Sequence, residues 1–329
     1  MRAVVVREFG SPEVASVETI PDPKPGPNDV LVAVKSTAVN FVDLLVIGGK
    51  YQFLPERPFV PGKLPVGQVT AIGSQVTAFK VGDRVQTLAE SGGYAEIVAV
   101  PESQCYRLPD SISFADAASM ALAYDTAWFA LRVRARCQSG ETVLVLGASG
   151  GVGLAAMQLA KAFGLRVIAG ISTPAKAELV RNNGADEIVD LSRQDLRDSL
   201  REQVYAATSN KGVEIILDSL GGDYFDAAIR SLAWSGRFVV IGFAAGRIPV
   251  VKANYLLLKN IEVSGLQVSD YRKRAPEQMA KCFTEIFSLY EQGQIKPAPT
   301  ITYPLEKFRD ALDQLQGRLS KGRIVLAIP

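Results

Sequence analysis

The second half of the chain alternates apolar runs with amphipathic segments. Short runs typical of buried strands are followed by stretches in which apolar residues recur every three or four positions. The expected strands cover residues 143–146, 166–171, 187–190, 213–218, 237–242 and 261–265, and the expected helices cover residues 152–163, 175–183, 195–207 and 224–232. Strands that alternate with helices form a parallel sheet. We therefore predict an α/β class chain with a doubly wound, six-stranded Rossmann domain.

The first 115 residues follow a different pattern. Short runs rich in Val and Ile are separated by turns that contain Gly, Pro or Asp, as in β-barrels and sandwiches. The expected strands cover residues 2–8, 14–20, 30–36, 66–72, 84–88 and 95–100. Beyond residue 265, two amphipathic segments (277–291 and 305–316) and a strand-like end (323–328) are expected to return to this first domain. We predict a β-rich domain over 1–123, an α/β domain over 124–265 and a returning segment over 266–329.

A glycine turn joins the first strand of the α/β domain to its helix. Residues 147–153 read Gly-Ala-Ser-Gly-Gly-Val-Gly. Gly150 lets the backbone approach a pyrophosphate, Gly153 lets the helix pack close to the strand, and the helix N-terminus attracts the phosphate charge. Ala148 replaces the first glycine of the strict fingerprint, and an α/β domain that binds nothing at this turn is the alternative. The predicted cofactor contacts of this turn are Ala148, Ser149, Gly150, Gly151, Val152 and Gly153.

The end of the second strand indicates which dinucleotide binds. In NAD-binding domains an acidic residue about 20 positions after the glycines contacts the ribose. Here the position holds Ile171, followed by Ser172 and Lys176, and Arg193 follows the third strand. These residues favour the 2′-phosphate of NADPH over NADH. Alternatively, Ser172 and Thr173 cap the next helix and Lys176 is a solvated surface residue.

Composition excludes several classes of partner. The net charge is +2, and no cluster of basic residues with interleaved aromatic residues occurs, so nucleic acid is not an expected partner. No signal peptide and no apolar stretch of membrane-spanning length is found, so we expect no membrane partner and a cytoplasmic protein. The three cysteines, Cys105, Cys137 and Cys282, are far apart and form no metal-binding or disulfide pattern.

The sequence contains no histidine. A Cys/His zinc site and a Ser-His-Asp device therefore cannot be assembled, and we expect no bound metal. Chemistry must depend on the cofactor together with hydroxyl, amide or backbone donors.

The order of parts and several short motifs resemble the zinc-independent quinone oxidoreductase branch of the medium-chain dehydrogenase/reductase superfamily. The motifs are Ala38-Val39-Asn40-Phe41-Val42-Asp43, Pro61-Gly62, Val81-Gly82-Asp83-Arg84-Val85, Gly92-Gly93-Tyr94-Ala95-Glu96, residues 147–153, Ser172 with Lys176, Gly184-Ala185-Asp186, Asp218-Ser219-Leu220-Gly221-Gly222 and Ile241-Gly242-Phe243. The resemblance covers essentially the whole chain. It implies a GroES-like β-barrel catalytic domain and an interdomain cleft in which NADPH gives hydride to a quinone or activated alkene.

The resemblance also implies roles for individual residues. Asn40 would lie near the nicotinamide and Tyr51 on the substrate side, and these two are the candidate catalytic residues. Further cofactor contacts would come from Thr126, Ser219, Gly242, Phe243, Ala244 and Leu266. Two alternatives apply to the catalytic pair: Asn40 is a good N-cap for a helix that begins at Phe41, and Tyr51 closes that helix against the barrel.

Three positions depart from the pattern of the branch. Lys63-Leu64-Pro65 replaces an acidic residue after the Pro-Gly turn, Leu45 replaces a tyrosine, and Asp125 replaces a glycine. Hydride transfer is therefore better supported than quinone as the acceptor. The alternatives are a reductase of enones or enoyl thioesters and a crystallin-like nucleotide-binding protein without turnover. The strand at 261–265 would leave an unpaired sheet edge, which favours a homodimer.

Overall fold

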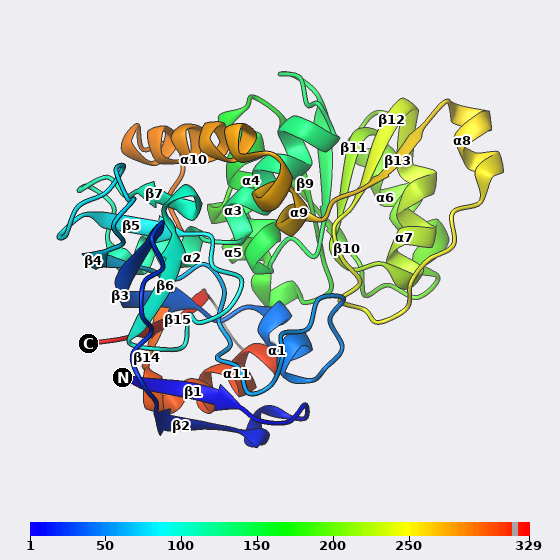
Figure 1. Cartoon of the computed structure of the whole chain (residues 1–329). Helices are drawn as coiled ribbons and strands as arrows, with labels where there is room; N and C mark the ends of the chain where they lie inside the picture. The colour runs from blue at the N-terminus through cyan, green and yellow to red at the C-terminus, as the bar shows by residue number, and fades with distance from the viewer. Residues whose placement is uncertain (318–321) are drawn as a thin grey trace. The chain divides into compact units, whose positions relative to one another are not determined.

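The computed structural model describes residues 1–317 and 322–329. The chain divides into two compact units (Figure 1). Unit 1 comprises Met1–Leu122, Tyr271–Glu291 and Pro297–Pro329, and unit 2 comprises Ala123–Asp270 and Gln292–Lys296. The chain passes from unit 2 to unit 1 within helix α9 (Val268–Arg274). The segment that we expected over 266–329 is therefore divided, because residues 266–270 and 292–296 cluster with unit 2.

Unit 2 contains a parallel six-stranded sheet in the order β10-β9-β8-β11-β12-β13. Its strands are β8 (Thr142–Leu146), β9 (Arg166–Ile171), β10 (Glu187–Asp190), β11 (Val213–Asp218), β12 (Leu232–Val240) and β13 (Glu262–Gly265). This is the doubly wound order, in which the chain reverses direction across the sheet between β8 and β11. The predicted Rossmann fold is thus confirmed.

One strand of unit 2 begins earlier than expected. The sequence predicted a start at residue 237. In the structure Ser235 has a φ of 62°, and the pairing register between β11 and β12 shifts between Val213 and Ile215. The strand therefore continues through a bulge back to Leu232.

Helices cover both faces of this sheet. The helices of unit 2 are α3 (Ala123–Trp128), α4 (Gly151–Ala162), α5 (Ala177–Asn182), α6 (Leu196–Ala207), α7 (Gly222–Ala228) and the exposed α8 (Ala253–Lys259). Right-handed crossovers place α4 and α5 on one face and α6 and α7 on the other (Figure 1). The expected helices at 175–183 and 224–232 each contain a 3₁₀ turn, at Pro174–Lys176 and Ile229–Ser231.

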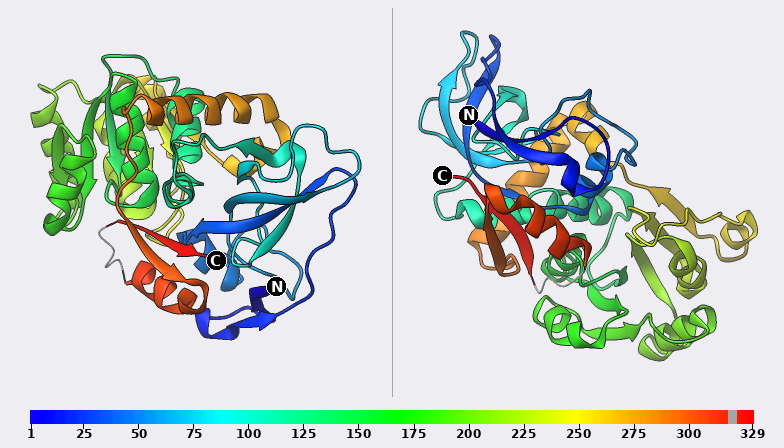
Figure 2. Two further views of the ribbon diagram at one scale, coloured as in Figure 1. Left: turned by 90° about the vertical axis from the view of Figure 1, so that its left-hand side faces the viewer. Right: turned by 90° about the horizontal axis from the view of Figure 1, so that it is seen from below.

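Unit 1 is built on a mainly antiparallel sheet in the order β14-β15-β3-β4-β5-β7, with β6 paired to β3 and a separate β1-β2 pair. The strands are β1 (Arg2–Val6), β2 (Ala15–Thr19), β3 (Asp29–Ala38), β4 (Val66–Ile72), β5 (Arg84–Thr87), β6 (Ile97–Pro101), β7 (Cys105–Arg107), β14 (Thr300–Pro304) and β15 (Arg323–Ala327). Figure 2 shows the C-terminal strand β15 beside β3, where Val325 lies opposite Ala38.

The helices of unit 1 are α1 (Phe41–Ile47), α2 (Phe114–Met120), α10 (Pro276–Glu291) and α11 (Phe308–Gln316). The Asp116 N–H donates to Ser113 Oγ at 3.0 Å, which caps the start of α2. Each unit has its own apolar core, centred on residues such as Val32 and Phe308 in unit 1 and Ile216 and Phe238 in unit 2. Within the described residues, no helix combines the length and apolar character needed to span a bilayer.

Candidate nucleotide and acceptor sites

The carboxyl ends of the six parallel strands meet at one edge of the unit 2 sheet. The strand registers align Asp190 with Ile171, Asp218 with both Leu146 and Val240, and Val240 with Gly265. The residues that follow these ends are Arg193 after β10, Ser172 and Lys176 after β9, residues 147–153 after β8, Ser219 after β11, Gly242, Phe243 and Ala244 after β12, and Leu266 after β13. The fold therefore brings these predicted cofactor contacts to the edge where doubly wound sheets bind ligands.

The glycine turn after β8 has the close packing that the sequence predicted. A Cβ at Gly153 would lie 2.4 Å from the Gly147 carbonyl oxygen and 2.7 Å from the Ala148 backbone. Gly147 has a φ of 70°. Helix α4 begins at Gly151, and the first N–H groups of an α-helix have no acceptor inside the helix. The turn fits a pyrophosphate because it offers backbone donors and a helix N-terminus, and four of its seven residues are glycines without a side chain.

The end of β9 presents a hydroxyl and an ammonium group. Ile171 is buried, Ser172 is exposed, and Lys176 is half-buried at the end of the 3₁₀ turn. Thr173 occupies the N-cap position of that turn, but its side chain makes no capping hydrogen bond. The simple capping interpretation of this segment is therefore wrong at Thr173. With no acidic side chain at the strand end, the site fits a 2′-phosphate.

Arg193 already has an acidic neighbour. Its Nε lies 3.8 Å from Asp190 Oδ2, and both side chains are more than a third exposed. The Ser192 hydroxyl and N–H both donate to Asp190 Oδ1 and lower the pKa of that carboxyl. Arg193 therefore offers a weaker phosphate contact than a cation without a nearby carboxylate.

A buried carboxyl shapes the loop after β11. Asp218 Oδ1 accepts the N–H groups of Leu220 (2.8 Å) and Gly221 (3.0 Å). Burial raises the pKa of Asp218 to about 6, although these two hydrogen bonds oppose the shift. The Ser219 hydroxyl donates to the Leu146 carbonyl at 3.3 Å, and the Ser219 carbonyl accepts the Ala244 N–H at 3.1 Å. Asp218 thus holds the loop after β11, and Ser219 connects that loop to the end of β8 and to the loop after β12. The Asp-x-x-Gly spacing indicates the role of Asp218 only weakly.

Thr126 lies on helix α3 and not at a strand end. It is buried, and its N–H donates to Asp125 Oδ1 at 2.7 Å. The neighbouring Tyr124 hydroxyl is buried and donates to Gln158 Oε1 on α4 at 2.9 Å. Asp125 therefore holds the backbone locally, and Tyr124 ties α3 to α4.

In unit 1, Asn40 stands at the N-cap position of α1, as predicted. Its backbone N–H donates to Asp43 Oδ2 at 2.8 Å, and the Tyr94 hydroxyl donates to the same oxygen at 3.1 Å. Burial raises the pKa of Asp43 to about 6, and the Asn40 hydrogen bond and the charge of Lys63 partly offset that rise. The Asp43–Tyr94 pair was not predicted, because the two residues are far apart in the sequence.

Tyr51 lies beyond the end of α1 and is half-buried. Its ring meets Phe53 edge-on at 6.5 Å, and the Nζ of Lys63 lies 5.3 Å from its centroid. Lys63, which departs from the pattern of the branch, is buried and forms an ion pair with Glu90 at 2.5 Å.

Glu90 connects Lys63 to a second buried cation. Its other carboxylate oxygen lies 2.7 Å from the Arg272 guanidinium, whose side chain is 2% exposed. Burial alone would raise the pKa of Glu90, but the charges of Arg272 and Lys63 prevail and lower it to about 2. An ionic cluster of buried Lys63 and Arg272 with half-buried Glu90 therefore lies beside the Tyr51 ring, which Lys63 contacts.

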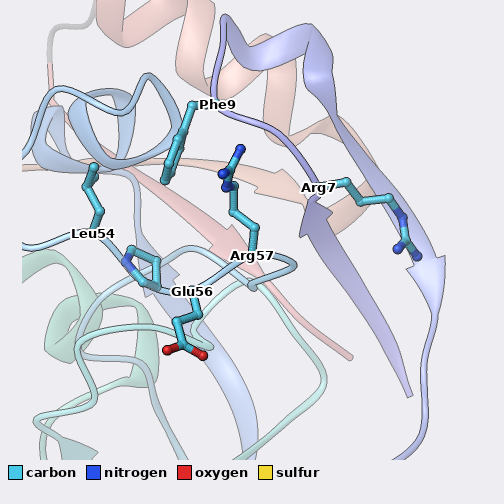
Figure 3. A pocket seen from close by; sticks show the side chains of 6 residues that line it. Arg7, Phe9, Leu54, Glu56 and Arg57 are labelled. Atoms are coloured by element: carbon cyan, nitrogen blue, oxygen red, sulfur yellow. The ribbon is translucent and has the colours of Figure 1, made fainter.

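A surface hollow of about 690 Å³ also lies in unit 1 (Figure 3). It is lined by Arg7, Phe9, Leu54, Pro55, Glu56 and Arg57. The Arg57 guanidinium stacks on the Phe9 ring at 4.6 Å. None of the predicted site residues lines this hollow. Across residues 1–317 and 322–329, no three His, Cys, Asp or Glu side chains are grouped as metal ligands would be.

Comparison with known proteins agrees with both units. Residues 26–110 match the alcohol dehydrogenase GroES-like domain, and residues 151–285 match the zinc-binding dehydrogenase family. A quinone oxidoreductase-like protein 2 homolog from Nematostella vectensis is 36% identical, with 99% of this chain and 88% of the relative covered. A mycobacterial protein solved in complex with NADPH is 33% identical, with a TM-score of 0.92 and 99% of each chain covered.

Escherichia coli quinone oxidoreductase, also solved in complex with NADPH, is 29% identical. Its TM-score is 0.91, and the match covers 99% of this chain and 100% of that protein. A GroES-like unit combined with a Rossmann unit defines a medium-chain dehydrogenase or reductase. More narrowly, the chain belongs to the zinc-independent quinone oxidoreductase branch of that superfamily and is a quinone oxidoreductase-like enzyme.

Proposed function

We propose that this protein transfers hydride from NADPH to a quinone or a related electrophile without a metal ion. The observation that carries the proposal is the sheet edge of unit 2, where the glycine turn and the Ser172–Lys176 segment follow neighbouring strands. Two relatives of known structure were solved as complexes with NADPH. The absence of histidine from the sequence supports a reaction without zinc.

The residues of unit 2 have binding roles in this proposal. Residues 148–153 and the N-terminus of α4 bind the pyrophosphate. Ser172 and Lys176 bind the 2′-phosphate, and Arg193, which is paired with Asp190, makes a weaker contact to it. Ser219, the segment 242–244 and Leu266 contact the nicotinamide half, and Thr126 contacts the cofactor from α3. A bound reduced nicotinamide supplies the hydride.

In this proposal, residues of unit 1 stabilise the negative charge that develops on the acceptor oxygen. Asn40 and Tyr51 orient the acceptor and donate hydrogen bonds to its oxygen. Neither group needs to titrate near neutral pH: an amide is not a base, and an unperturbed tyrosine has a pKa of about 10. A quinone suits this arrangement because its reduction yields a stabilised anion, whereas an enone or enoyl thioester needs an acid at the α-carbon.

A panel of acceptors tests the proposal. Oxidation of NADPH is followed at one enzyme concentration with quinones, enones and enoyl thioesters. Rapid turnover with quinones supports the proposal, and turnover confined to enones or thioesters supports the double-bond reductase. NADPH binding without turnover on any acceptor supports a crystallin-like protein and contradicts the proposal.

Lys176→Ala is expected to weaken NADPH binding and spare NADH. Loss of a charged contact to the 2′-phosphate costs about 1.5–3 kcal/mol, which raises the NADPH Kd by about tenfold or more. The Kd values for both cofactors are measured by fluorescence titration. Lys161→Ala, which removes a lysine paired with Asp186 on the same unit, serves as the control. Equal weakening of NADPH and NADH in Lys176→Ala would assign Lys176 a structural role.

We also propose a homodimer formed through the outer edge of unit 2. Strand β13 is the last strand of the sheet, and exposed apolar side chains lie nearby in sequence. Leu257 and Leu258 on α8 are 79% and 72% exposed, and Ile248 and Val250 are similarly exposed. Such a concentration of exposed apolar side chains is typical of an interface, and pairing of β13 with its copy would cover the edge.

The dimer is tested by mass in solution. The chain is 35.4 kDa, and the wild type is expected at twice that mass by light scattering. Replacing both Leu257 and Leu258 with Asp is expected to give the monomer, because two charges would be buried in the interface. A wild type that remains a monomer at micromolar concentration would disprove the dimer.

A further inference from the structure

The side-chain amide of Asn40 lies between a group that only donates hydrogen bonds and a group that only accepts them. Arg323 Nη2 donates to Asn40 Oδ1 at 2.8 Å, and Asn40 Nδ2 donates to the Ala38 carbonyl at 3.2 Å. Asn40 is 4% exposed, so water competes little for either bond. These two contacts determine which end of the amide lies on which side.

Each partner permits one orientation. A guanidinium has no acceptor, so the amide atom that faces Arg323 must be the oxygen. A backbone carbonyl has no donor, so the atom that faces Ala38 must be the nitrogen. The capping box between Asn40 and Asp43 keeps the residue at the start of α1. The Ala38 carbonyl accepts one N–H of the Asn40 amide. The hydrogen bonds of the described residues leave the other N–H for a ligand.

Arg323 is itself fixed by the fold. It is the first residue of β15, and its Nε donates to the Ser119 carbonyl on α2 at 3.0 Å. Its backbone N–H donates to the Pro299 carbonyl at 3.0 Å. The guanidinium therefore bridges the C-terminal strand, α2 and the start of α1, and its position does not depend on Asn40 alone.

We propose that Arg323 is a positioning residue that fixes the Asn40 amide as a hydrogen-bond donor, so that the enzyme selects acceptors with a carbonyl oxygen at the reacting end. The inference rests on the proposed function, in which Asn40 contacts the acceptor. The inference explains why the Asn40 amide, which is able to rotate by 180°, directs its NH₂ group and not its oxygen toward the acceptor. Quinones, enones and thioesters all carry the required oxygen.

Four variants test the inference. Arg323→Met removes one of the contacts that orient the amide and leaves the one to the Ala38 carbonyl, whereas Arg323→Lys retains a partner that only donates. Asn40→Asp keeps an acceptor for Arg323 and a good N-cap but removes the amide donor. Arg84→Met is the matched control: Arg84 also donates to backbone carbonyls of unit 1, including that of Pro109 at 3.0 Å, but contacts neither Asn40 nor Tyr51 in the described contacts.

The expected kinetics separate positioning from folding. Arg323→Met is expected to lower kcat/KM for the quinone about tenfold, with an unchanged Kd for NADPH, and Arg323→Lys is expected to recover most of that loss. Asn40→Asp should lose at least as much activity as Arg323→Met, and its thermal midpoint is measured beside its kinetics. Arg84→Met should retain wild-type kcat/KM.

A measurement without turnover reads the orientation directly. The side-chain amide signals of Asn40 are assigned in a protein labelled with ¹⁵N-asparagine as those lost in Asn40→Asp. They are expected as one pair in the wild type and in Arg323→Lys. In Arg323→Met they are expected to shift or broaden as both orientations become populated.

The outcomes distinguish the inference from the proposed function. If the wild type reduces no acceptor, the proposed function fails, and the amide signals still decide whether Arg323 orients Asn40. If Asn40→Asp lowers activity while Arg323→Met changes neither the kinetics nor the amide signals, the inference is wrong and the proposed function stands. Equal losses in Arg323→Lys and Arg323→Met, with lowered thermal midpoints, would also overturn the inference.

Discussion

Gly153→Val is expected to abolish useful NADPH binding by raising the Kd at least about 100-fold, equivalent to about 2.7 kcal/mol. A Cβ at this position would lie 2.4 Å from the Gly147 carbonyl oxygen and 2.7 Å from the Ala148 backbone. Both neighbours are backbone atoms of the turn that follows β8, so neither is able to rotate away. Helix α4 must then move away from the strand and carry its N-terminus out of reach of the phosphates.

The Kd is measured by titration of NADPH fluorescence. Gly153→Ala, which adds a single methyl group, is expected to give an intermediate Kd and covers the case in which the valine variant does not fold. Gly265→Ala is the control, because a Cβ at Gly265 would meet nothing within 4 Å. Wild-type affinity in both Gly153 variants would mean that the dinucleotide does not use this turn.

The second large effect is expected in the pH dependence of stability. The folded pKa of Asp43 is about 6, raised by burial and partly offset by the Asn40 N–H, Lys63, Tyr94 and Arg323. An unfolded Asp has a pKa of about 3.9. Because the folded state binds the proton more tightly, this group stabilises the fold at pH 4 and loses that contribution as the pH rises through 6. The loss between pH 4 and pH 7 is about 2 kcal/mol.

Asp43→Asn removes this titration and resembles the protonated acid. Relative to the wild type, the variant is therefore expected to gain about 2 kcal/mol between pH 4 and pH 7. The free energies of unfolding are measured by urea denaturation across that range. Asp110→Asn, at a fully exposed carboxyl, is the control and is expected to show no such gain. A stability difference between Asp43→Asn and wild type that is independent of pH would show that Asp43 remains ionised in the folded protein.

The sequence predicted the nucleotide-binding edge better than the acceptor side. Its strands at 166–171, 187–190 and 213–218 were predicted with the bounds that the structure has. A parallel strand covered on both faces is a continuous apolar run, and its loop follows immediately in the chain. Pattern and site therefore lie within a few residues of each other, and local reasoning is sufficient.

The acceptor side depends on contacts between distant segments. Arg323 meets Asn40 across 283 positions and Arg272 meets Glu90 across 182. Neither periodicity nor motif spacing predicts such a pair, because the position of each partner depends on where its own strand or helix packs. Lys63 illustrates the consequence: its charge was visible in the sequence, but its burial against Glu90 was not.

The sequence by itself determined the alternation of strands and helices, the glycine turn, the absence of an acid at the end of β9 and the absence of histidine. Those features depend on residue type and short-range spacing. Only the tertiary structure decided which polar groups are buried together: Asp43 with Tyr94, Glu90 with two cations, and Asn40 with Arg323. Burial makes these contacts strong and shifts the pKa of the groups involved, and burial is a property of packing that a linear pattern does not contain.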